Sequence, residues 1–214
     1  MPNQLIYFAD PMCSWCWGFS PVIDTIQETW GEDLPVLLVL GGLQPGTTKP
    51  LNGKAKDSIR EHWDHVHERT DQPFDHSFFD REGFVYDTEP PSRAIVAMHS
   101  LAKDGSLAAL KAMHSAFYAD NRDVTDGDTL ADIAEELGHE REAFLMAFDS
   151  EDSKVATQRG FEFSRGIRVT GFPTLLAGDN ENGFRALTQG YQDFESIKPG
   201  IEAYLEKPAI NPTD

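Results

Sequence analysis

The sequence predicts an α/β fold in which a block of helices interrupts a sheet, and three observations predict it. A strand–helix–strand pattern occupies residues 5–43, and a long stretch of almost purely helical signals follows. Strand signals then return at residues 174–187, before a last helix. A single sheet whose strands come from both ends of the sequence explains this order of elements. We therefore expect residues 1–50 and 151–214 to form the sheet domain and residues 51–150 to form an all-helical insertion.

The amino-terminal unit begins with a short apolar run at residues 5–8, which predicts a buried strand. Residues 34–43 are apolar apart from Pro35 and a pair of glycines, which predicts a second strand, parallel to the first and fully buried. Between the two runs, apolar residues recur at helical spacing as far as Gly31, a typical helix stop: Val22, Ile23, Ile26 and Trp30.

The middle of the chain carries helical patterns and helix-capping residues from residue 54 to about residue 165. Thr88 is expected to cap a helix that has two prolines in its first turn, where missing N–H groups cost little. Ser106 and Asp128 are expected to cap two further helices, because short polar side chains accept hydrogen bonds from the first N–H groups of a helix.

The carboxyl-terminal unit is predicted to contain a hairpin of residues 174–177 and 184–187, joined by a polar turn. A final helix is expected to start near Asp193. Pro199 is expected to kink this helix or to mark its break, because proline lacks the N–H group that a helix interior needs.

Charge and apolar content exclude several classes of protein. The chain of 214 residues carries 18 basic and 36 acidic residues, a formal net charge of −18, which repels nucleic acid and anionic membranes. Apolar residues make up 40% of the chain, enough for a sizeable core. We find no run long enough to span a bilayer and no signal peptide pattern. We therefore expect a cytoplasmic protein, in which paired cysteines indicate redox catalysis or metal binding.

The two cysteines form the motif Cys13-Ser14-Trp15-Cys16, directly after a predicted strand and at the start of a predicted helix. Here Cys13 faces the unpaired N–H groups and the positive end of the helix dipole, which stabilise a thiolate. A spacing of three residues places Cys16 close enough to form a small disulfide ring. We expect Cys13 to be the exposed, attacking sulfur and Cys16 the buried, resolving one, with Ser14 and Trp15 contacting substrate.

Metal binding is the main alternative use of these cysteines. A zinc site needs about four ligands, and this chain has no third cysteine. Four histidines lie in one stretch of sequence, where they could bind a metal, but a solvated helix face explains them equally well: His62, His65, His67 and His76. We therefore expect no bound metal or cofactor, and a redox-active disulfide between Cys13 and Cys16. Two inert core cysteines are the remaining alternative.

A second motif, Gly171-Phe172-Pro173-Thr174, stands just before a predicted strand. Together the two motifs resemble the thioredoxin superfamily, in which such a loop lies against the redox pair. The resemblance implies a cis bond between Phe172 and Pro173. It also implies that the backbone of Phe172 pairs with an extended, cysteine-containing substrate segment, with Pro173 beside it.

The expected helical insertion narrows the resemblance to the DsbA-like branch, and residues 84–94 resemble its FrnE-like cytoplasmic members and predicted disulfide isomerases. The resemblance implies a thioredoxin-like fold interrupted by an all-helical insertion domain. It also implies a thiol–disulfide oxidoreductase or isomerase that acts on a disulfide-containing protein or small thiol substrate. A reductase or glutathione would recycle it.

Two positions depart from that family. Many relatives carry histidine or proline between the cysteines, where this chain has Ser14 and Trp15. Thioredoxin and DsbA also keep a buried carboxylate six residues before the first cysteine, where this chain has Tyr7. The proton of Cys16 must therefore go elsewhere, to Asp10 or to water.

Two other functions stay open at this stage. The first is a small-molecule enzyme on the same fold, either a dithiol-assisted isomerase or a glutathione transferase of the kappa type. Such transferases typically have serine in place of Cys13, so the intact pair of cysteines argues against them. The second is a non-catalytic binding protein or holdase that uses the apolar rim around the pair.

Overall fold

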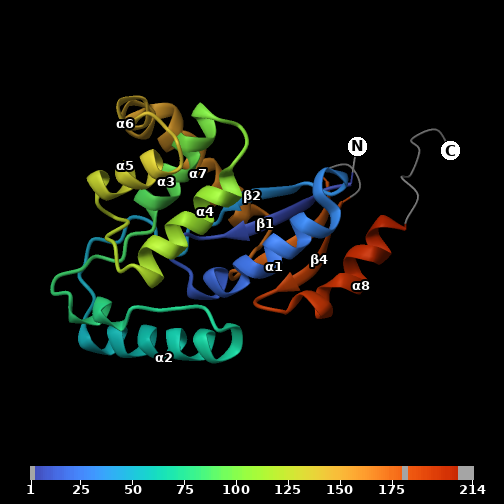
Figure 1. Cartoon of the computed structure of the whole chain (residues 1–214), viewed down its shortest axis with the longest axis horizontal. Helices are drawn as coiled ribbons and strands as arrows, with labels where there is room; N and C mark the ends of the chain where they lie inside the picture. Colours follow the sequence, from blue (N-terminus) through green and yellow to red (C-terminus); the bar gives the residue numbers. More distant parts are fainter. Residues whose placement is uncertain (1–2, 180–182, 207–214) are drawn as a thin grey trace.

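The computed structural model describes residues 3–179 and 183–206, and its centre is a four-stranded mixed sheet with the strand order β2-β1-β3-β4 (Figure 1). β1 pairs in parallel with β2 and antiparallel with β3, which continues into β4 as a hairpin. The strands and the helices that flank them in sequence are β1 (Leu5–Ala9), α1 (Ser14–Trp30), β2 (Val36–Leu40), β3 (Thr174–Asp179), β4 (Gly183–Gln189) and α8 (Phe194–Leu205). The predicted α/β fold is confirmed, and the helical block enters between β2 and β3.

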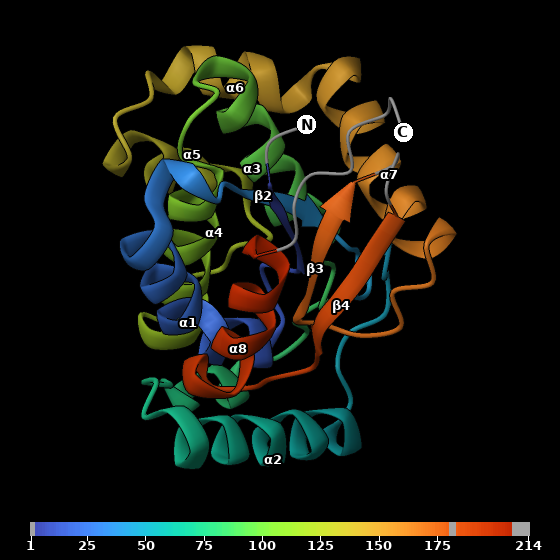
Figure 2. The ribbon, with the colours of Figure 1, turned by 90° about the vertical axis from the view of Figure 1, so that its right-hand side faces the viewer.

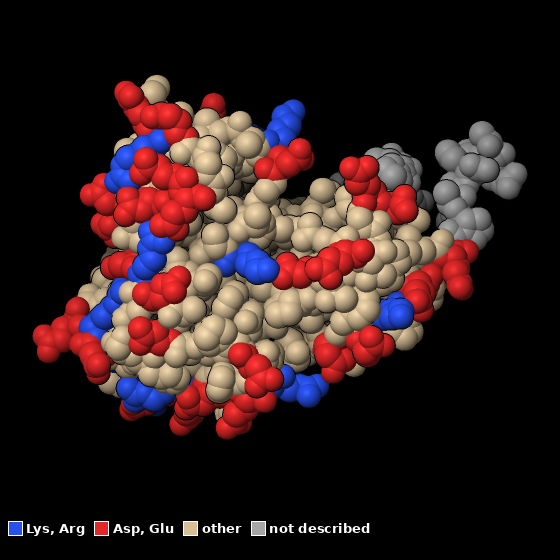
Figure 3. Space-filling model, in the orientation of Figure 1, with Lys and Arg blue, Asp and Glu red and all other residues tan. Residues whose placement is uncertain are grey.

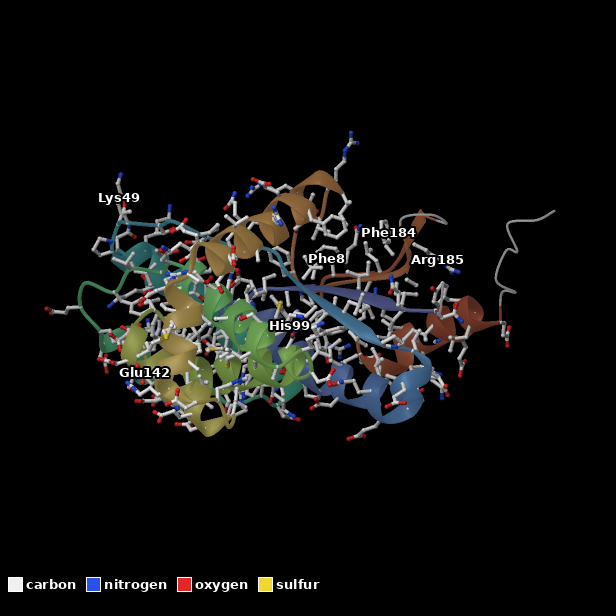
Figure 4. The ribbon with its side chains drawn as sticks, turned by 90° about the horizontal axis from the view of Figure 1, so that it is seen from above. Phe8, Lys49, His99, Glu142, Phe184 and Arg185 are labelled. Atoms are coloured by element: carbon white, nitrogen blue, oxygen red, sulfur yellow. The ribbon has the colours of Figure 1, made fainter. Side chains whose placement is uncertain are left out.

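β1 is buried on both faces, and its alternating side chains separate two layers of core. Tyr7 packs against Phe19 of α1, with ring centroids 5.7 Å apart. On the opposite face Phe8 packs against Phe163 of α7 (Glu151–Gly166), 5.9 Å away. Phe8 and Phe184 lie on the α7 side of the sheet (Figure 4). Tyr7 therefore points toward the helix that carries the two cysteines.

β2 is parallel to β1 as predicted, but the prediction that it is fully buried is wrong. Among the described strands it pairs with β1 alone, so it forms an edge of the sheet. Its Leu37 side chain is 47% exposed. A continuous apolar run predicts burial on both faces, yet the sequence of one strand does not reveal whether another strand will cover its outer edge.

The helical block lies beside one end of the sheet, on the left in Figure 1, and Figure 2 shows the molecule from the opposite end. The α-helices of the block besides α7 are α2 (Gly53–Thr70), α3 (Glu89–Leu101), α4 (Ser106–His114), α5 (Gly127–Glu136) and α6 (Arg141–Asp149). Two 3-10 turns, η1 (Gly31–Asp33) and η2 (His76–Asp80), and a π-helical turn, η3 (Ser115–Ala119), complete the described elements. A buried aromatic cluster around Trp63 ties α2, η2 and η3 together, since its ring centroid lies 4.7 Å from that of Phe79 and 5.2 Å from that of Tyr118.

The predicted caps of three helices in this block need correction. Asp126 rather than Asp128 caps α5, because the Asp126 carboxylate accepts from the Thr129 N–H at 2.9 Å. Gly105 precedes α4, and Ser106 is already its first residue. Thr88 does precede α3, but its hydroxyl accepts from the Gln44 N–H at 3.1 Å instead of capping the helix. Sequence spacing leaves such choices open by a residue or two.

The carboxyl-terminal hairpin is confirmed, with longer strands than predicted, and residues 180–182 of its turn lie outside the described residues. α8 starts after Asp193, whose carboxylate accepts from the Ser196 N–H at 3.0 Å. Of the two expected effects of Pro199, a kink or a break, the break is wrong, because α8 runs through this residue as one element. The carbonyl group that loses its partner belongs to Glu195 in the exposed first turn, where water can replace the missing N–H group.

Acidic side chains predominate on the face in Figure 3, over the helical block and over the far end of the sheet. Among the described residues, none of the helices combines the length and the hydrophobicity that crossing a bilayer requires.

Candidate redox site

The two cysteines lie at the junction between β1 and α1. Cys13 is the N-cap residue of α1, and its carbonyl oxygen accepts from the N–H groups of Cys16 at 2.9 Å and Trp17 at 3.1 Å. Both cysteines are free thiols in this structure. The first turn of the helix therefore holds the two residues one turn apart, as the strand-to-helix position of the motif predicts.

The two thiols differ in their surroundings. Cys16 is 0% exposed, as predicted, and burial raises the pKa of its thiol well above the ordinary value. The prediction that Cys13 is exposed is wrong, because only 7% of this residue is accessible. The Cys13 thiol donates to the carbonyl oxygen of Phe172 at 3.6 Å, so the loop before β3 covers the helix tip.

The Phe172 loop is held in place from two sides. The peptide bond between Phe172 and Pro173 is cis, and the Pro173 carbonyl oxygen accepts from the Gly190 N–H at 2.7 Å. The Phe172 ring lies directly over Gly41, where a Cβ atom would stand 2.0 Å from the ring. In the part of the chain that the structure describes, the Phe172 N–H donates to no protein acceptor. This backbone group is free to pair with a substrate.

Trp15 and Ser14 are half-buried at the same helix tip. The Trp15 ring packs against Tyr191, with centroids 5.6 Å apart, and the Arg69 guanidinium lies 5.9 Å from the centre of the Tyr191 ring. Arg69 also forms an ion pair with Asp193 at 3.3 Å. The structure thus places an aromatic rim with one cationic side chain beside the predicted redox pair.

Asp10 is completely buried in the loop between β1 and α1. One carboxylate oxygen accepts from the Met12 N–H at 2.9 Å and the other from the Leu43 N–H at 2.7 Å, which joins the ends of β1 and β2. Burial nevertheless raises the pKa of this carboxyl group from 3.8 to about 6, because the two N–H donors replace only part of the lost hydration. A buried carboxylate that titrates near neutrality therefore lies next to the cysteines.

His114 is a site residue that sequence reasoning missed. It comes from the end of α4, is completely buried, and its Nε2 donates to the backbone carbonyl oxygen of Asp10 at 3.0 Å. Its Nδ1 lies 3.4 Å from the Ser20 hydroxyl. Burial lowers the pKa of His114 to about 4, so the ring is neutral. The available signal was its position four residues after Leu110, on the apolar face of the helix.

Tyr7 and Tyr86 complete the buried surroundings of the pair. Tyr86, from the loop before α3, donates its hydroxyl to the carbonyl oxygen of Met12. Tyr7 occupies the centre of β1, and its hydroxyl lies beside the Cys16 thiol. The position where thioredoxin keeps a carboxylate is thus filled by a phenol.

The histidines of α2 do not form a metal site with their neighbours. Across residues 3–179 and 183–206, no three His, Cys, Asp or Glu side chains converge as metal ligands would. His76, the first residue of η2, approaches the Asp64 carboxylate of α2 at 3.6 Å.

Comparisons with known proteins agree with this geometry. The family model of the DSBA-like thioredoxin domain matches residues 4–199. Among curated proteins, the chain is similar to the ClpXP adapter protein SpxH of Bacillus subtilis, at 21% identity over 99% of this chain and 71% of that protein. It spans only 58% of the SpxH of Halalkalibacterium halodurans, at 20% identity.

Solved structures give a stronger match. A provisionally named protein disulfide isomerase from Nitrosomonas europaea is 33% identical, with a TM-score of 0.90 over 96% of this chain and 98% of that one. The cytosolic disulfide reductase DsbM from Pseudomonas aeruginosa is 26% identical, with a TM-score of 0.77 over 94% of this chain and 98% of that one. DsbM has also been solved with GSH. The chain belongs to the DsbA-like thioredoxin domain family.

Proposed function

We propose that this protein is a thiol–disulfide oxidoreductase or disulfide isomerase in which Cys13 attacks and Cys16 resolves. One observation carries the proposal: Cys13 lies at the tip of α1 against the Phe172 carbonyl oxygen, while Cys16 lies fully buried one turn below. The outer sulfur meets an incoming disulfide first, and the unpaired N–H groups of the helix start stabilise its thiolate.

The reaction runs in two exchange steps. The Cys13 thiolate attacks one sulfur of the substrate disulfide, forms a mixed disulfide and releases the other substrate sulfur as a thiolate. Cys16 then attacks the Cys13 sulfur, which forms the Cys13–Cys16 disulfide and releases the second substrate thiol. A reductase or glutathione restores the dithiol, in keeping with the binding of GSH to the related DsbM. In isomerisation, the substrate's own thiol attacks the mixed disulfide instead.

Asp10 is the group that accepts the proton of Cys16 in this scheme. Its carboxylate is buried in the same loop, with a pKa of about 6, and its charge acts on the Cys16 thiol. A carboxylate with a pKa near neutrality exchanges protons readily at physiological pH. The proton then passes to the departing substrate thiolate, so the second step needs no external acid.

We propose that the substrate is a disulfide in an extended peptide or protein segment of the cytoplasm. The free N–H group of Phe172 pairs with the backbone of that segment, and Trp15 contacts its apolar side chains. Pro173 is buried directly behind Phe172, so it contacts the substrate segment only at its edge. The description of the related DsbM as a cytosolic disulfide reductase supports the same compartment and the same class of reaction.

The low exposure of Cys13 favours a second candidate, an enzyme for small disulfides or other small molecules that react with a dithiol. Only 7% of the residue is accessible, so a small disulfide of the glutathione type reaches the sulfur without moving the Phe172 loop. A folded protein would need to present its disulfide on a flexible, extended segment.

Trapping of the mixed disulfide tests the proposal. The Cys16→Ala variant should retain substrate through a disulfide to Cys13 that reductant releases, because no second thiol can resolve it. The Cys13→Ala variant, which keeps one cysteine in the same turn, should retain nothing. Mass spectrometry of species trapped in the native cell would identify proteins or small thiols. Equal trapping by both variants, or by neither, would contradict the assigned roles.

A further inference from the structure

The hydroxyl of Tyr7 has no role in the reaction scheme described above. Tyr7 is the middle residue of β1 and is 1% exposed. Its ring packs against Phe19, and Phe19 follows Cys16 by three residues on the same face of α1. The phenol therefore lies beneath the helix turn that carries Cys16, between the sheet and the inner thiol.

This hydroxyl has no satisfactory partner in the reduced protein. Its oxygen is buried, and it makes no well-formed hydrogen bond within the described residues, although it lies beside the Cys16 thiol. Buried hydroxyl groups nearly always have a partner, because removing one from water without replacement costs about 1–3 kcal/mol. A neutral thiol is a weak acceptor and compensates little of that cost. A thiolate would be a strong acceptor.

We propose that the Tyr7 hydroxyl is the hydrogen-bond donor that stabilises the Cys16 thiolate while the mixed disulfide is resolved. This role rests on the proposed function and deepens it. The hydroxyl bonds to the Cys16 sulfur once that sulfur becomes charged, since no hydrogen bond joins the two groups in the reduced protein. A phenol at this position replaces a carboxylate as the group below the inner cysteine, and it acts as a donor rather than as a base.

The step balances without any further reagent. Cys16 passes its proton to the Asp10 carboxylate, and its sulfur forms a bond to the Cys13 sulfur. The bond between Cys13 and the substrate sulfur breaks, and that sulfur leaves with the electron pair and takes up a proton. Tyr7 keeps its proton throughout, because burial and the nearby cysteines hold the pKa of its hydroxyl well above the ordinary value.

Neighbouring groups do not offer an equivalent donor. The Nε2–H of His114 is committed to the Asp10 carbonyl oxygen, and the ring is neutral. The Tyr86 hydroxyl is committed to the Met12 carbonyl oxygen. The Asp10 backbone assists the thiolate, but its carboxylate opposes it by charge repulsion. Among the described groups around this sulfur, the Tyr7 hydroxyl is therefore the donor without an acceptor.

The test is the Tyr7→Phe variant, which removes one oxygen and keeps the ring. A mixed disulfide between Cys13 and thionitrobenzoate releases a coloured thiol when Cys16 resolves it, so stopped-flow absorbance gives the rate at each pH. We expect resolution to slow about 10-fold to 100-fold, as befits the loss of a hydrogen bond to a charged group. The midpoint of the pH profile should rise. The first attack by Cys13 should be unchanged.

Tyr204→Phe is the control for the loss of a phenol, because the Tyr204 hydroxyl accepts from the Gln4 N–H at 3.4 Å, at the opposite end of β1 from the cysteines. Its resolution rate should equal that of the unaltered protein. Unchanged resolution in Tyr7→Phe, or equal slowing in both variants, would overturn the proposal.

A second measurement separates this inference from the proposed function. In a Cys13→Ser background, the carbon-13 chemical shift of the Cys16 Cβ reports ionisation of the inner thiol without any redox chemistry. Adding Tyr7→Phe should raise the midpoint of that titration by about one to two pH units. An unchanged midpoint would refute the role of Tyr7 even if the pair proves redox-active. If the midpoint rises but no mixed disulfide ever forms, the proposed function fails while the donor role stands.

Discussion

The two sulfur atoms of the pair lie in regions that differ in almost every physical respect. The outer region consists of Cys13, Trp15, Phe172, Pro173 and Tyr191, and it is apolar, partly exposed and formed by three distant segments of the chain. The inner region consists of the four buried groups under the helix tip: Tyr7, Asp10, Cys16 and His114. Burial shifts the pKa values of all four groups in the direction that favours the uncharged form.

The comparison shows that the three-residue spacing brings the two cysteines together, whereas their different surroundings give them different roles. Cys13 and Cys16 are chemically identical and one helical turn apart, yet Cys13 keeps 7% exposure beside the Phe172 carbonyl group and Cys16 has no access to water. The helical block contributes to this difference between the two cysteines, because His114 reaches from α4 into the turn just before Cys13. The block therefore supports the inner region directly, in addition to any effect on substrate choice.

The largest expected effect concerns two buried groups whose titrations oppose each other. The pKa of Asp10 rises from 3.8 to about 6 on folding, so Asp10 makes stability fall as the pH rises through that window. The pKa of His114 falls from 6.5 to about 4, so His114 makes stability fall as the pH drops through its window. Each effect amounts to about 3 kcal/mol, and they largely cancel in the unaltered protein.

Single variants should break this cancellation in opposite directions. His114→Gln should lose stability, relative to the unaltered protein, as the pH rises from 4 to about 6. Asp10→Asn should lose stability, on the same scale, as the pH drops from 6.5 to about 4. Denaturant unfolding of the reduced proteins across this range measures both. Slopes that run parallel to that of the unaltered protein would show that the inner region does not hold these two groups uncharged.

The next effect concerns the outer region alone. A Gly41→Ala substitution would place a Cβ atom 2.0 Å from the Phe172 ring, so the ring and its loop must move. We expect a loss of about 1–3 kcal/mol in the free energy of unfolding, as for other overpacked sites, and a several-fold change in the rate at which Cys13 reacts with a disulfide. The pH dependence of stability should stay unchanged. Rapid mixing and denaturant unfolding measure the two quantities.

Gly127→Ala is the control for this substitution. Gly127 is the first residue of α5, a new Cβ atom there meets no atom within 4 Å, and its φ angle lies outside the left-handed region. It should leave reactivity unchanged and raise stability slightly, because alanine has fewer unfolded conformations than glycine. Unchanged reactivity in Gly41→Ala as well would mean that the position of Phe172 does not govern access to Cys13.

The sequence predicts the outer region better than the inner one, for physical reasons. Two local motifs predict the outer region: a pair of cysteines at a strand-to-helix junction, and a proline before a strand. In both, the residue types themselves indicate the chemistry. The position of Cys16 inside the core follows from helical spacing. His114 is different, because its role depends on where α4 packs, and a histidine on an apolar helix face reveals no partner. The burial of Cys13 likewise depends on how far the Phe172 loop reaches.

The same limit applies to the fold. Alternation and apolar runs predict the strands, their order and the helical block between them, because these patterns are local. The exposed edge of β2 and the hydroxyl contact of Thr88 with Gln44 depend on which segments become neighbours. One sequence contains that information only through the complete packing of the chain.

The smallest expected effect separates peptide substrates from small ones. Trp15 is half-buried and packs against Tyr191 at the rim, so Trp15→Ala removes apolar surface beside Cys13 without touching either sulfur. We expect a drop of about 3-fold to 10-fold in the rate of exchange with a disulfide-bonded apolar peptide, as for an ordinary aromatic contact in an interface. The rate with glutathione disulfide should hardly change, because that molecule is too small to cover the rim.

Trp30→Ala is the matched control, since Trp30 ends the same helix and packs against Phe194, with centroids 5.8 Å apart. It should affect neither substrate. Equal losses with both disulfides would mean that Trp15 supports the geometry of the pair, and no loss with the peptide would favour the small-molecule enzyme.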